Sequence, residues 1–247
     1  TNTSVCKDVV GGTLNLTGKV GDVVQWQQSI NNGASWVDIA NTSTSFTAPA
    51  LAQTTHYRVE VKSGNCLSSF SNVATIQVKA TPTITDIPNQ EICLGATQIF
   101  GDAFVAGNTY SLTSNLGYSS ATNQSNILFN TVGTQVFTYV VTNTASGCSV
   151  QDQFQVITNS LPAATMVANT TICEGTSVDL GASPITGNTY LWSSNPAGFT
   201  STNANPSVAP SATTSYALVE TNTATGCSKT NNVQITVQPK PIISITG

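Results

Sequence analysis

The six cysteines of this chain divide it into three similar blocks. One cysteine opens each block (Cys6, Cys93 and Cys173), and another closes it after 60, 55 and 54 residues (Cys66, Cys148 and Cys227). A period of about 80 residues with one cysteine pair per copy is typical of an array of small domains. The sequence therefore predicts domains at residues 1–80, 81–160 and 161–239.

The last eight residues carry a further sign of repetition. Residues 240–247 resemble residues 80–87, the segment that opens the second repeat. The chain also begins without Met and without a signal peptide. We therefore expect a fragment or a processed form, in which residues 240–247 are the start of a further repeat.

Strand signals dominate every repeat. In the segment HYRVEV, the side chains of Tyr57, Val59 and Val61 alternate with those of His56, Arg58 and Glu60, which is the period of a half-buried strand. No segment of ten or more residues shows the apolar period of a helix. About seven short strands per repeat is the size of an immunoglobulin-type sandwich. The sequence thus predicts an all-β fold of tandem immunoglobulin-like β-sandwiches, with one disulfide per domain.

The spacing within each repeat suggests how the cysteines pair. The opening cysteine precedes the first strong strand, and the closing cysteine lies in the last hairpin, whose segments SGNC, ASGC and ATGC carry a turn glycine. We expect each bridge to join these two positions at one end of its own sandwich, which predicts the pairs Cys6–Cys66, Cys93–Cys148 and Cys173–Cys227. Such bridges indicate an oxidising compartment.

The composition excludes several classes of function. Charged residues make up only 7% of the chain, with a net charge of −4, whereas a nucleic-acid partner requires clustered Lys and Arg. The lone histidine, His56, has no nucleophile context, and the eleven carboxylates are dispersed. We predict no enzyme activity, no cofactor, no metal site and no membrane insertion. Calcium at a domain junction, bound by Asp86 or Asp102, stays open as an alternative.

The three tryptophans have different expected roles. Trp26 and Trp192 lie within predicted strands, at the position of the core tryptophan of a sandwich. The second repeat has Leu112 at this position, which suggests a repacked core. Trp36 follows the turn SINNGAS and is the one candidate for stacking on a ligand, against the alternative that it packs on its own hairpin.

These segments resemble the immunoglobulin-like and PKD-like repeats of large surface and secreted proteins of the Bacteroidetes. The resemblance rests on the "QEICLG" and "TTICEG" segments, the "NTYLWSSN" strand, the "TTHYRVEV" strand and the closing "GC" hairpins. The first repeat is similar to one subtype and the other two to a neighbouring one. The resemblance implies an extracellular or cell-surface adhesin, stalk or filament protein, exported through the type IX secretion route.

The resulting hypothesis is a structural and adhesive repeat segment of a long extracellular filament or adhesin. Its partners would be other copies, neighbouring repeats of the same long chain, or a cell-surface glycan or protein. Neutral Thr, Ser and Asn surfaces favour self-association, because bringing them together costs less than desolvating ions. The alternatives are a polysaccharide-binding module that uses Trp36, and a non-catalytic spacer of a large secreted enzyme.

Overall fold

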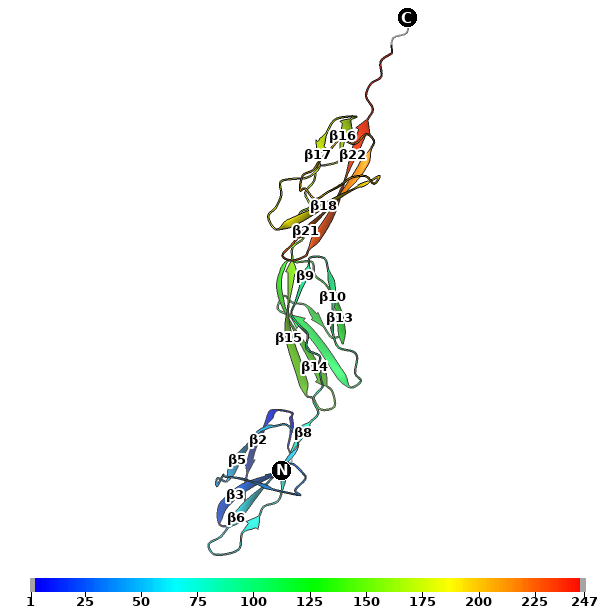
Figure 1. Ribbon diagram of the computed structural model, residues 1–247. Helices are drawn as coiled ribbons and strands as arrows, with labels where there is room; N and C mark the ends of the chain where they lie inside the picture. Colours follow the sequence, from blue (N-terminus) through cyan, green and yellow to red (C-terminus); the bar gives the residue numbers. More distant parts are fainter. Residues whose placement is uncertain (1–2, 245–247) are drawn as a thin grey trace. The chain divides into compact units, whose positions relative to one another are not determined.

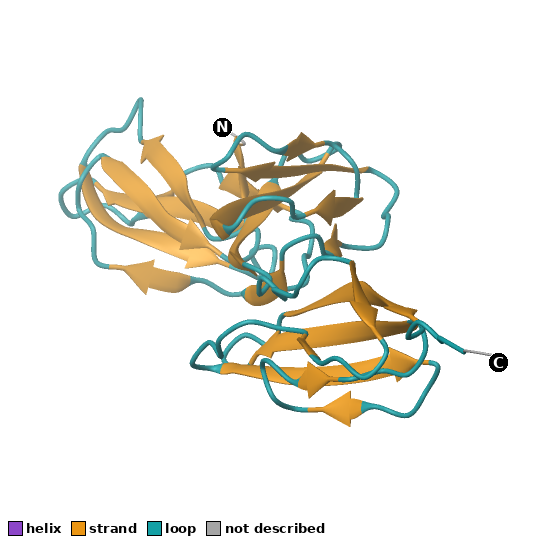
Figure 2. Ribbon diagram, turned by 90° about the horizontal axis from the view of Figure 1, so that it is seen from above, coloured by secondary structure: helices purple, strands orange, loops and turns teal. Residues whose placement is uncertain are grey.

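The computed structural model describes residues 3–244, and within this range all regular structure is β-strand (Figures 1 and 2). The predicted all-β class is confirmed. The prediction for residues 240–247 falls partly on residues 245–247, which lie outside the described range. The turn glycines expected in the closing hairpins, Gly64, Gly147 and Gly226, have positive φ, the conformation that such turns require.

The strands follow the three repeats in order. The first repeat has β1 (Thr3–Cys6), β2 (Val9–Asn15), β3 (Asp22–Ser29), β4 (Val37–Ile39), β5 (Ser45–Leu51), β6 (Thr55–Lys62), β7 (Ser69–Phe70) and β8 (Ala74–Lys79). The second has β9 (Gln90–Cys93), β10 (Thr97–Gly101), β11 (Asn108–Ser114), β12 (Ser119–Ser120), β13 (Gln124–Leu128), β14 (Gly133–Asn143) and β15 (Ser149–Asn159). The third has β16 (Thr170–Cys173), β17 (Val178–Asp179), β18 (Asn188–Asn195), β19 (Thr200–Ser201), β20 (Ser207–Val208), β21 (Thr214–Asn222) and β22 (Ser228–Gln238).

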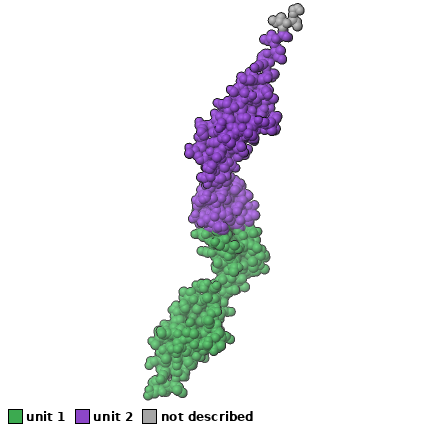
Figure 3. All heavy atoms as spheres, viewed as in Figure 1, with its two compact units in different colours: residues 1–87, 101–125, 138–153 green, residues 88–100, 126–137, 154–247 purple. Residues whose placement is uncertain are grey.

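The chain divides into two compact units, which Figure 3 colours separately. Unit 1 comprises residues 1–87, 101–125 and 138–153, and unit 2 comprises residues 88–100, 126–137 and 154–247. The division passes through the second repeat. The domain limits at residues 80, 160 and 239 therefore stay a prediction.

The first repeat lies wholly within unit 1 and forms a sandwich. One sheet has the order β1-β8-β6-β3-β4, with β7 beside β6, and the other consists of β2 and β5. The predicted alternation in β6 is confirmed as far as Val59, because Tyr57 and Val59 are buried while His56 and Arg58 are only half-buried. It does not extend to Val61, which is half-buried like Glu60. The core joins residues of both sheets: Leu14, Val23, Trp26, Ala48, Leu51, Tyr57, Val59 and Ile76.

The third repeat lies in unit 2 and has the same plan. Its larger sheet has the order β16-β22-β21-β18-β19, and β17 pairs with β20. Trp192 is fully buried at the centre of the core, and its indole nitrogen donates a hydrogen bond to the Asn203 carbonyl at 2.9 Å. In the first repeat Trp26 is likewise buried and donates to the Ser43 carbonyl at 2.9 Å. The predicted core role of both tryptophans is confirmed.

The second repeat has a sheet of order β12-β11-β14-β15-β9 and the pair β10-β13. Leu112 on β11 is fully buried, as expected for a leucine that replaces the core tryptophan. Within unit 2, Phe154 packs against Phe100 and Phe137 with ring centroids 4.8 and 5.4 Å apart. These aromatic rings supply apolar contact area in a repeat that lacks tryptophan.

A short parallel strand borders the larger sheet of every repeat. β1 pairs with β8, β9 with β15, and β16 with β22, each in parallel orientation. The opening cysteine ends this short strand, opposite Lys79, Asn159 or Gln238 at the end of the last strand. Each opening cysteine therefore lies where the chain leaves its repeat. The sequence pattern did not indicate this parallel pairing.

Three buried tyrosines give the protein a testable response to alkaline pH. Burial raises the pKa of Tyr57, Tyr139 and Tyr216 above the ordinary value of 10.0, because the charged phenolate would lose its hydration. The hydroxyl of Tyr57 is buried and has no hydrogen-bond partner. The Thr55 side chain lies nearby and opposes the rise in the Tyr57 pKa, but it does not reach hydrogen-bonding geometry.

A raised native pKa means that this contribution to stability is complete below about pH 10 and is lost as the pH rises through the native pKa values. We expect the free energy of unfolding to fall above pH 10, as measured by urea titrations at several pH values. Tyr216→Phe should weaken the pH dependence of the stability of the third repeat. The second repeat already has a phenylalanine, Phe137, at the corresponding position. The expectation would be contradicted if all three tyrosines in the folded protein showed phenolate absorbance already near pH 10.

Candidate functional site

The disulfides join consecutive repeats, which corrects the predicted pairing. Cys6 bonds to Cys148, with 5.6 Å between the Cα atoms, and Cys93 bonds to Cys227, with 5.5 Å. All six cysteines lie among the described residues, and Cys66 and Cys173 are free and exposed. The predicted bridges Cys6–Cys66, Cys93–Cys148 and Cys173–Cys227 are therefore wrong, as is the expectation of one bridge within each domain.

The length of the last strand explains the correction. Cys227 directly precedes β22, whereas Cys173 pairs with Gln238 at its far end. An extended strand rises about 3.3 Å per residue, so the 11 residues of β22 separate the two cysteines by roughly 35 Å. A disulfide requires Cα atoms about 4.4–6.8 Å apart. The two cysteines of one repeat cannot meet, whereas the opening cysteine of one repeat meets the closing hairpin of the next.

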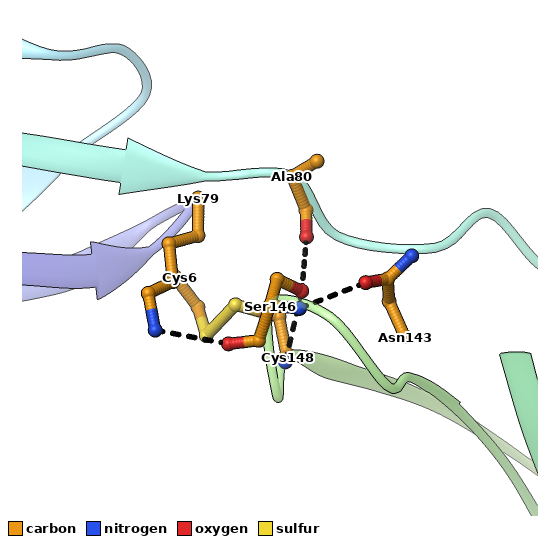
Figure 4. Close-up of a disulfide and its surroundings, with 6 residues drawn as sticks. All are labelled: Cys6, Lys79, Ala80, Asn143, Ser146 and Cys148. Carbon is orange, nitrogen blue, oxygen red and sulfur yellow. Dashed lines mark hydrogen bonds between the residues drawn. A yellow bond between two sulfur atoms is a disulfide. The ribbon is translucent and has the colours of Figure 1, made fainter. Parts of the chain in front are cut away.

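Hydrogen bonds surround the Cys6–Cys148 bridge within unit 1 (Figure 4). The Lys79 ammonium donates to the Ser146 carbonyl at 3.1 Å, and the Ser146 hydroxyl donates to the Ala80 carbonyl at 2.7 Å. The Ser146 backbone amide in turn donates to the Asn143 side chain at 2.9 Å. The exit of the first repeat is therefore joined to the closing hairpin of the second by one covalent bond and two hydrogen bonds.

Carboxylates hold the linkers that follow β8 and β15. In unit 1, the Asp102 carboxylate accepts from the Thr85 amide at 3.2 Å, and the Asp152 carboxylate accepts from the Ile87 amide at 2.8 Å. Glu220 accepts from a linker amide in the same way. Asp102, Asp152 and Glu220 are therefore three of the eleven carboxylates in the chain, each with a hydrogen bond from a linker amide. These acids therefore position backbone, which is a structural role.

Glu220 on β21 is a residue that the sequence reasoning missed. It is only 2% exposed, and its two carboxylate oxygens accept from the Ala164 amide at 2.6 Å and from the Asn188 side chain at 2.7 Å. The Asn231 side chain donates to the Ala164 carbonyl at 2.8 Å. The signal in the sequence was a charged residue on the same strand face as Tyr216 and Leu218. Such a position requires hydrogen-bond partners once it is buried.

Among residues 3–244, the structure brings together no cluster that could hold a metal ion. No group of three or more His, Cys, Asp or Glu side chains gathers there. Asp102, a candidate calcium ligand, accepts a hydrogen bond from the Thr85 amide, and Asp86, the other candidate, is exposed. The His56 imidazole lies 3.0 Å from the Thr75 hydroxyl on the neighbouring strand. A cleft of about 530 Å³ on the first repeat has Arg58 as the one charged residue in its lining, so it pairs no acid with a base.

Trp36 lies in a cluster with Arg58 and Phe70. The guanidinium carbon of Arg58 is 4.2 Å from the centroid of the Trp36 ring and 3.9 Å from that of the Phe70 ring. The Arg58 side chain also donates to the Gln27 side chain at 2.7 Å, which fixes its position. Trp36 is half-buried, and its ring approaches Gly33 in its own hairpin. This packing favours the structural role of Trp36 over sugar stacking.

Tryptophan substitutions separate these roles. Trp192→Ala should destabilise its repeat by about 3–5 kcal/mol, since it empties a buried core position. Trp36→Ala should cost only about 1 kcal/mol, because it removes mainly a surface cation–π contact. Chemical denaturation of both variants measures the difference. A glycan array should show no binding that depends on Trp36, and binding lost in Trp36→Ala would restore the sugar-stacking role.

Two family descriptions match parts of the chain. Residues 1–80 match a domain of unknown function (DUF8696), and residues 161–239 match the Ig-like domain described as CHU_C associated. No curated protein matches the chain. Together with the strand order of each sandwich, the second match identifies tandem immunoglobulin-like domains. Within the described range, no helix could cross a membrane.

The chain is also remotely similar to solved structures. Extracellular domains 3–5 of Drosophila OTK are 11% identical, with 96% of this chain and 94% of that chain covered and a TM-score of 0.36. The I-band fragment I67–I69 of titin is 11% identical, with 96% and 95% covered and a TM-score of 0.36. Fibronectin(III)-like modules of Clostridium thermocellum CbhA are 10% identical, with 64% and 94% covered and a TM-score of 0.33.

Proposed function

We propose that this chain is a structural and adhesive segment of a long extracellular or cell-surface filament or adhesin, without catalytic activity. The observation that carries the proposal is the pairing of Cys6 with Cys148 and of Cys93 with Cys227. A bridge within one domain stabilises that domain alone. A bridge between consecutive repeats carries tension past the linker, which is of use to a protein that is pulled along its length.

Disulfides favour an oxidising location outside the cytoplasm. The resemblance of the cysteine, strand and hairpin segments to Bacteroidetes surface repeats supports the same location and an export route of type IX. The match of residues 161–239 to an Ig-like domain agrees with such a role. The carboxylates of Asp102, Asp152 and Glu220 hold the linkers, and the cleft on the first repeat contains no paired acids. Both observations agree with a mechanical role for this segment.

The composition supports contact with other copies. Lys, Arg, Asp and Glu supply only 7% of the residues, so two surfaces can approach with few charges to desolvate. Several large apolar side chains are also exposed, among them Val20, Phe104 and Leu116. Weak lateral association between segments is therefore part of the proposal, and its partners are copies of the same protein or surface molecules of neighbouring cells.

Immunoelectron microscopy tests the location and the assembly. Antibodies raised against this chain should label filaments or a surface layer on intact cells of the source organism. Cells from which the gene has been deleted are the control, and they should also adhere less to surfaces and to one another. Labelling confined to the cell interior, or unchanged adhesion after deletion, would contradict the proposal.

A further inference from the structure

The two free cysteines occupy the same positions in their repeats as the four bonded ones. Cys173 ends the parallel edge strand β16, as Cys6 ends β1 and Cys93 ends β9. Cys66 follows the turn after β6, as Cys148 follows the turn after β14 and Cys227 the turn after β21. Each bridge joins an opening cysteine to the closing cysteine of the next repeat. One opening and one closing position therefore remain unpaired.

The bonded and free positions also differ in burial. Cys148 and Cys227 are completely buried, and Cys6 and Cys93 are half-buried. Cys66 and Cys173 are exposed. Since the positions are equivalent within the repeat, the difference reflects the neighbouring repeat that covers each bonded cysteine.

Exposed apolar side chains follow both Cys66 and the last strand of the third repeat. Leu67, which follows Cys66, is 94% exposed, whereas a serine follows Cys148 and Cys227. Past the exit end where Cys173 lies, Ile242 and Ile243 are 95% and 87% exposed.

The position of Ile243 has a counterpart in each of the two linkers. Two residues after the linker proline stand Ile84 in the first linker, Ala164 in the second and Ile243 after β22. Ile84 is half-buried, and Ala164 is fully buried in the core of the third repeat. At this position Ala164 is thus covered by the third repeat, whereas Ile243 is exposed.

We infer that Cys66 and Cys173 are the two complementary halves of the same inter-repeat link. Cys173 forms a disulfide with the closing-hairpin cysteine of an adjoining repeat of this kind, and Cys66 forms one with an opening-strand cysteine. A second copy of this chain supplies both partners, joined Cys173 to Cys66. The inference depends on the cysteine positions and holds whether or not the segment is adhesive.

The chemistry is an ordinary thiol–disulfide exchange. The Cys173 and Cys66 thiols together lose two protons and two electrons as the sulfur–sulfur bond forms. A small disulfide oxidant such as oxidised glutathione takes up these electrons and protons and becomes two thiols. Because the two partner surfaces differ, the contact is heterologous and can extend from copy to copy in an open series.

The first test uses the purified chain with its two native disulfides intact. It is incubated at about 1 mM, comparable to the effective concentration of a tethered partner, with reduced and oxidised glutathione. After the thiols are blocked, non-reducing gels should show a ladder of oligomers, and peptide mass spectrometry should find mainly Cys66–Cys173 cross-links. A statistical mixture that includes Cys66–Cys66 and Cys173–Cys173 would overturn the inference.

Two single variants sharpen the result. Cys66→Ser and Cys173→Ser remove exposed, unbonded side chains, so both variants should fold. Each variant alone should stay monomeric, whereas an equal mixture should form a dimer that grows no further. A disulfide-linked dimer from either variant alone would contradict the directional link.

A tandem duplicate of the full chain supplies the link within one polypeptide. Cys173 of its first copy should pair with Cys66 of its second without dependence on protein concentration. Pairing in the duplicate but not between separate chains would assign the partner to a repeat of the same polypeptide. Free thiols in both formats would overturn the inference, and none of these results depends on surface labelling of cells.

Discussion

Pulled from its two ends in the oxidised state, the chain should extend to about 290 Å, whereas the reduced chain should extend to about 890 Å at ~3.6 Å per residue. The shortest covalent path runs from the amino terminus to Cys6, across to Cys148, back along the chain to Cys93, across to Cys227 and on to the carboxyl terminus. This path contains roughly 80 of the 247 residues. Single-molecule force spectroscopy measures both limits.

The unfolding steps should differ as well. Between the two bridges, the stretch from Cys93 to Cys148 is the shortest connection, so it bears the load once the ends are pulled. Oxidised molecules should therefore show one main step, from the second repeat, with a gain of about 160 Å, because its 55 residues reach about 200 Å at ~3.6 Å each and already span roughly 35 Å when folded along β15. Reduced molecules should show a separate step for each repeat.

Two variants control this measurement. Cys66→Ser/Cys173→Ser changes only free cysteines and should leave the oxidised trace unchanged. Cys6→Ser/Cys148→Ser should release the first repeat and lengthen the oxidised chain. Bridges within each repeat would lock the stretch from Cys93 to Cys148, so an oxidised trace without the step of about 160 Å would contradict the observed pairing.

The second large effect concerns Glu220. Replacing it with alanine leaves the Ala164 amide and the Asn188 side chain without their acceptor, in a buried place. We expect the third repeat to lose about 2–4 kcal/mol of stability, since a buried donor without a partner retains its full desolvation penalty. Hydrogen–deuterium exchange of the Asn188–Asn195 strand, followed by mass spectrometry, reports this loss for the third repeat alone.

Two further substitutions test the cause. Glu174→Ala changes an exposed acid whose backbone amide, rather than its side chain, donates the hydrogen bond to Gln238, and it should alter stability by less than about 0.5 kcal/mol. Glu220→Val introduces the residue that Val141 provides in the second repeat, but it leaves the same two donors without an acceptor. If Glu220→Val were as stable as the native chain, the hydrogen bonds to Ala164 and Asn188 would not matter.

The sequence was sufficient where the structure depends on neighbours along the chain. The alternation around Tyr57, the burial of Trp26 and Trp192, and the replacement of that tryptophan by Leu112 all follow from patterns within one strand. The glycines of the closing hairpins take the positive φ that their turns require. These local patterns also carry the repeat itself and the all-β class.

The candidate site was less predictable from sequence. Glu220 lies on a buried face, where its contribution to stability depends on a linker amide 56 residues away. Trp36 stands after a turn, and only the folded sheet brings Arg58 on β6 and Phe70 on β7 to it. Contacts of this kind depend on side chains from separate strands, which the spacing within one segment does not encode.

The positions of the six cysteines along the chain indicate three repeats, with one opening and one closing position in each. Their pairing depends on how each repeat folds. The short opening strand adds in parallel to the last strand, so Cys173 lies beside Gln238, a whole strand length from Cys227. A disulfide cannot span that distance. The cysteines therefore bond across repeats, and one of each kind is left at Cys66 and Cys173.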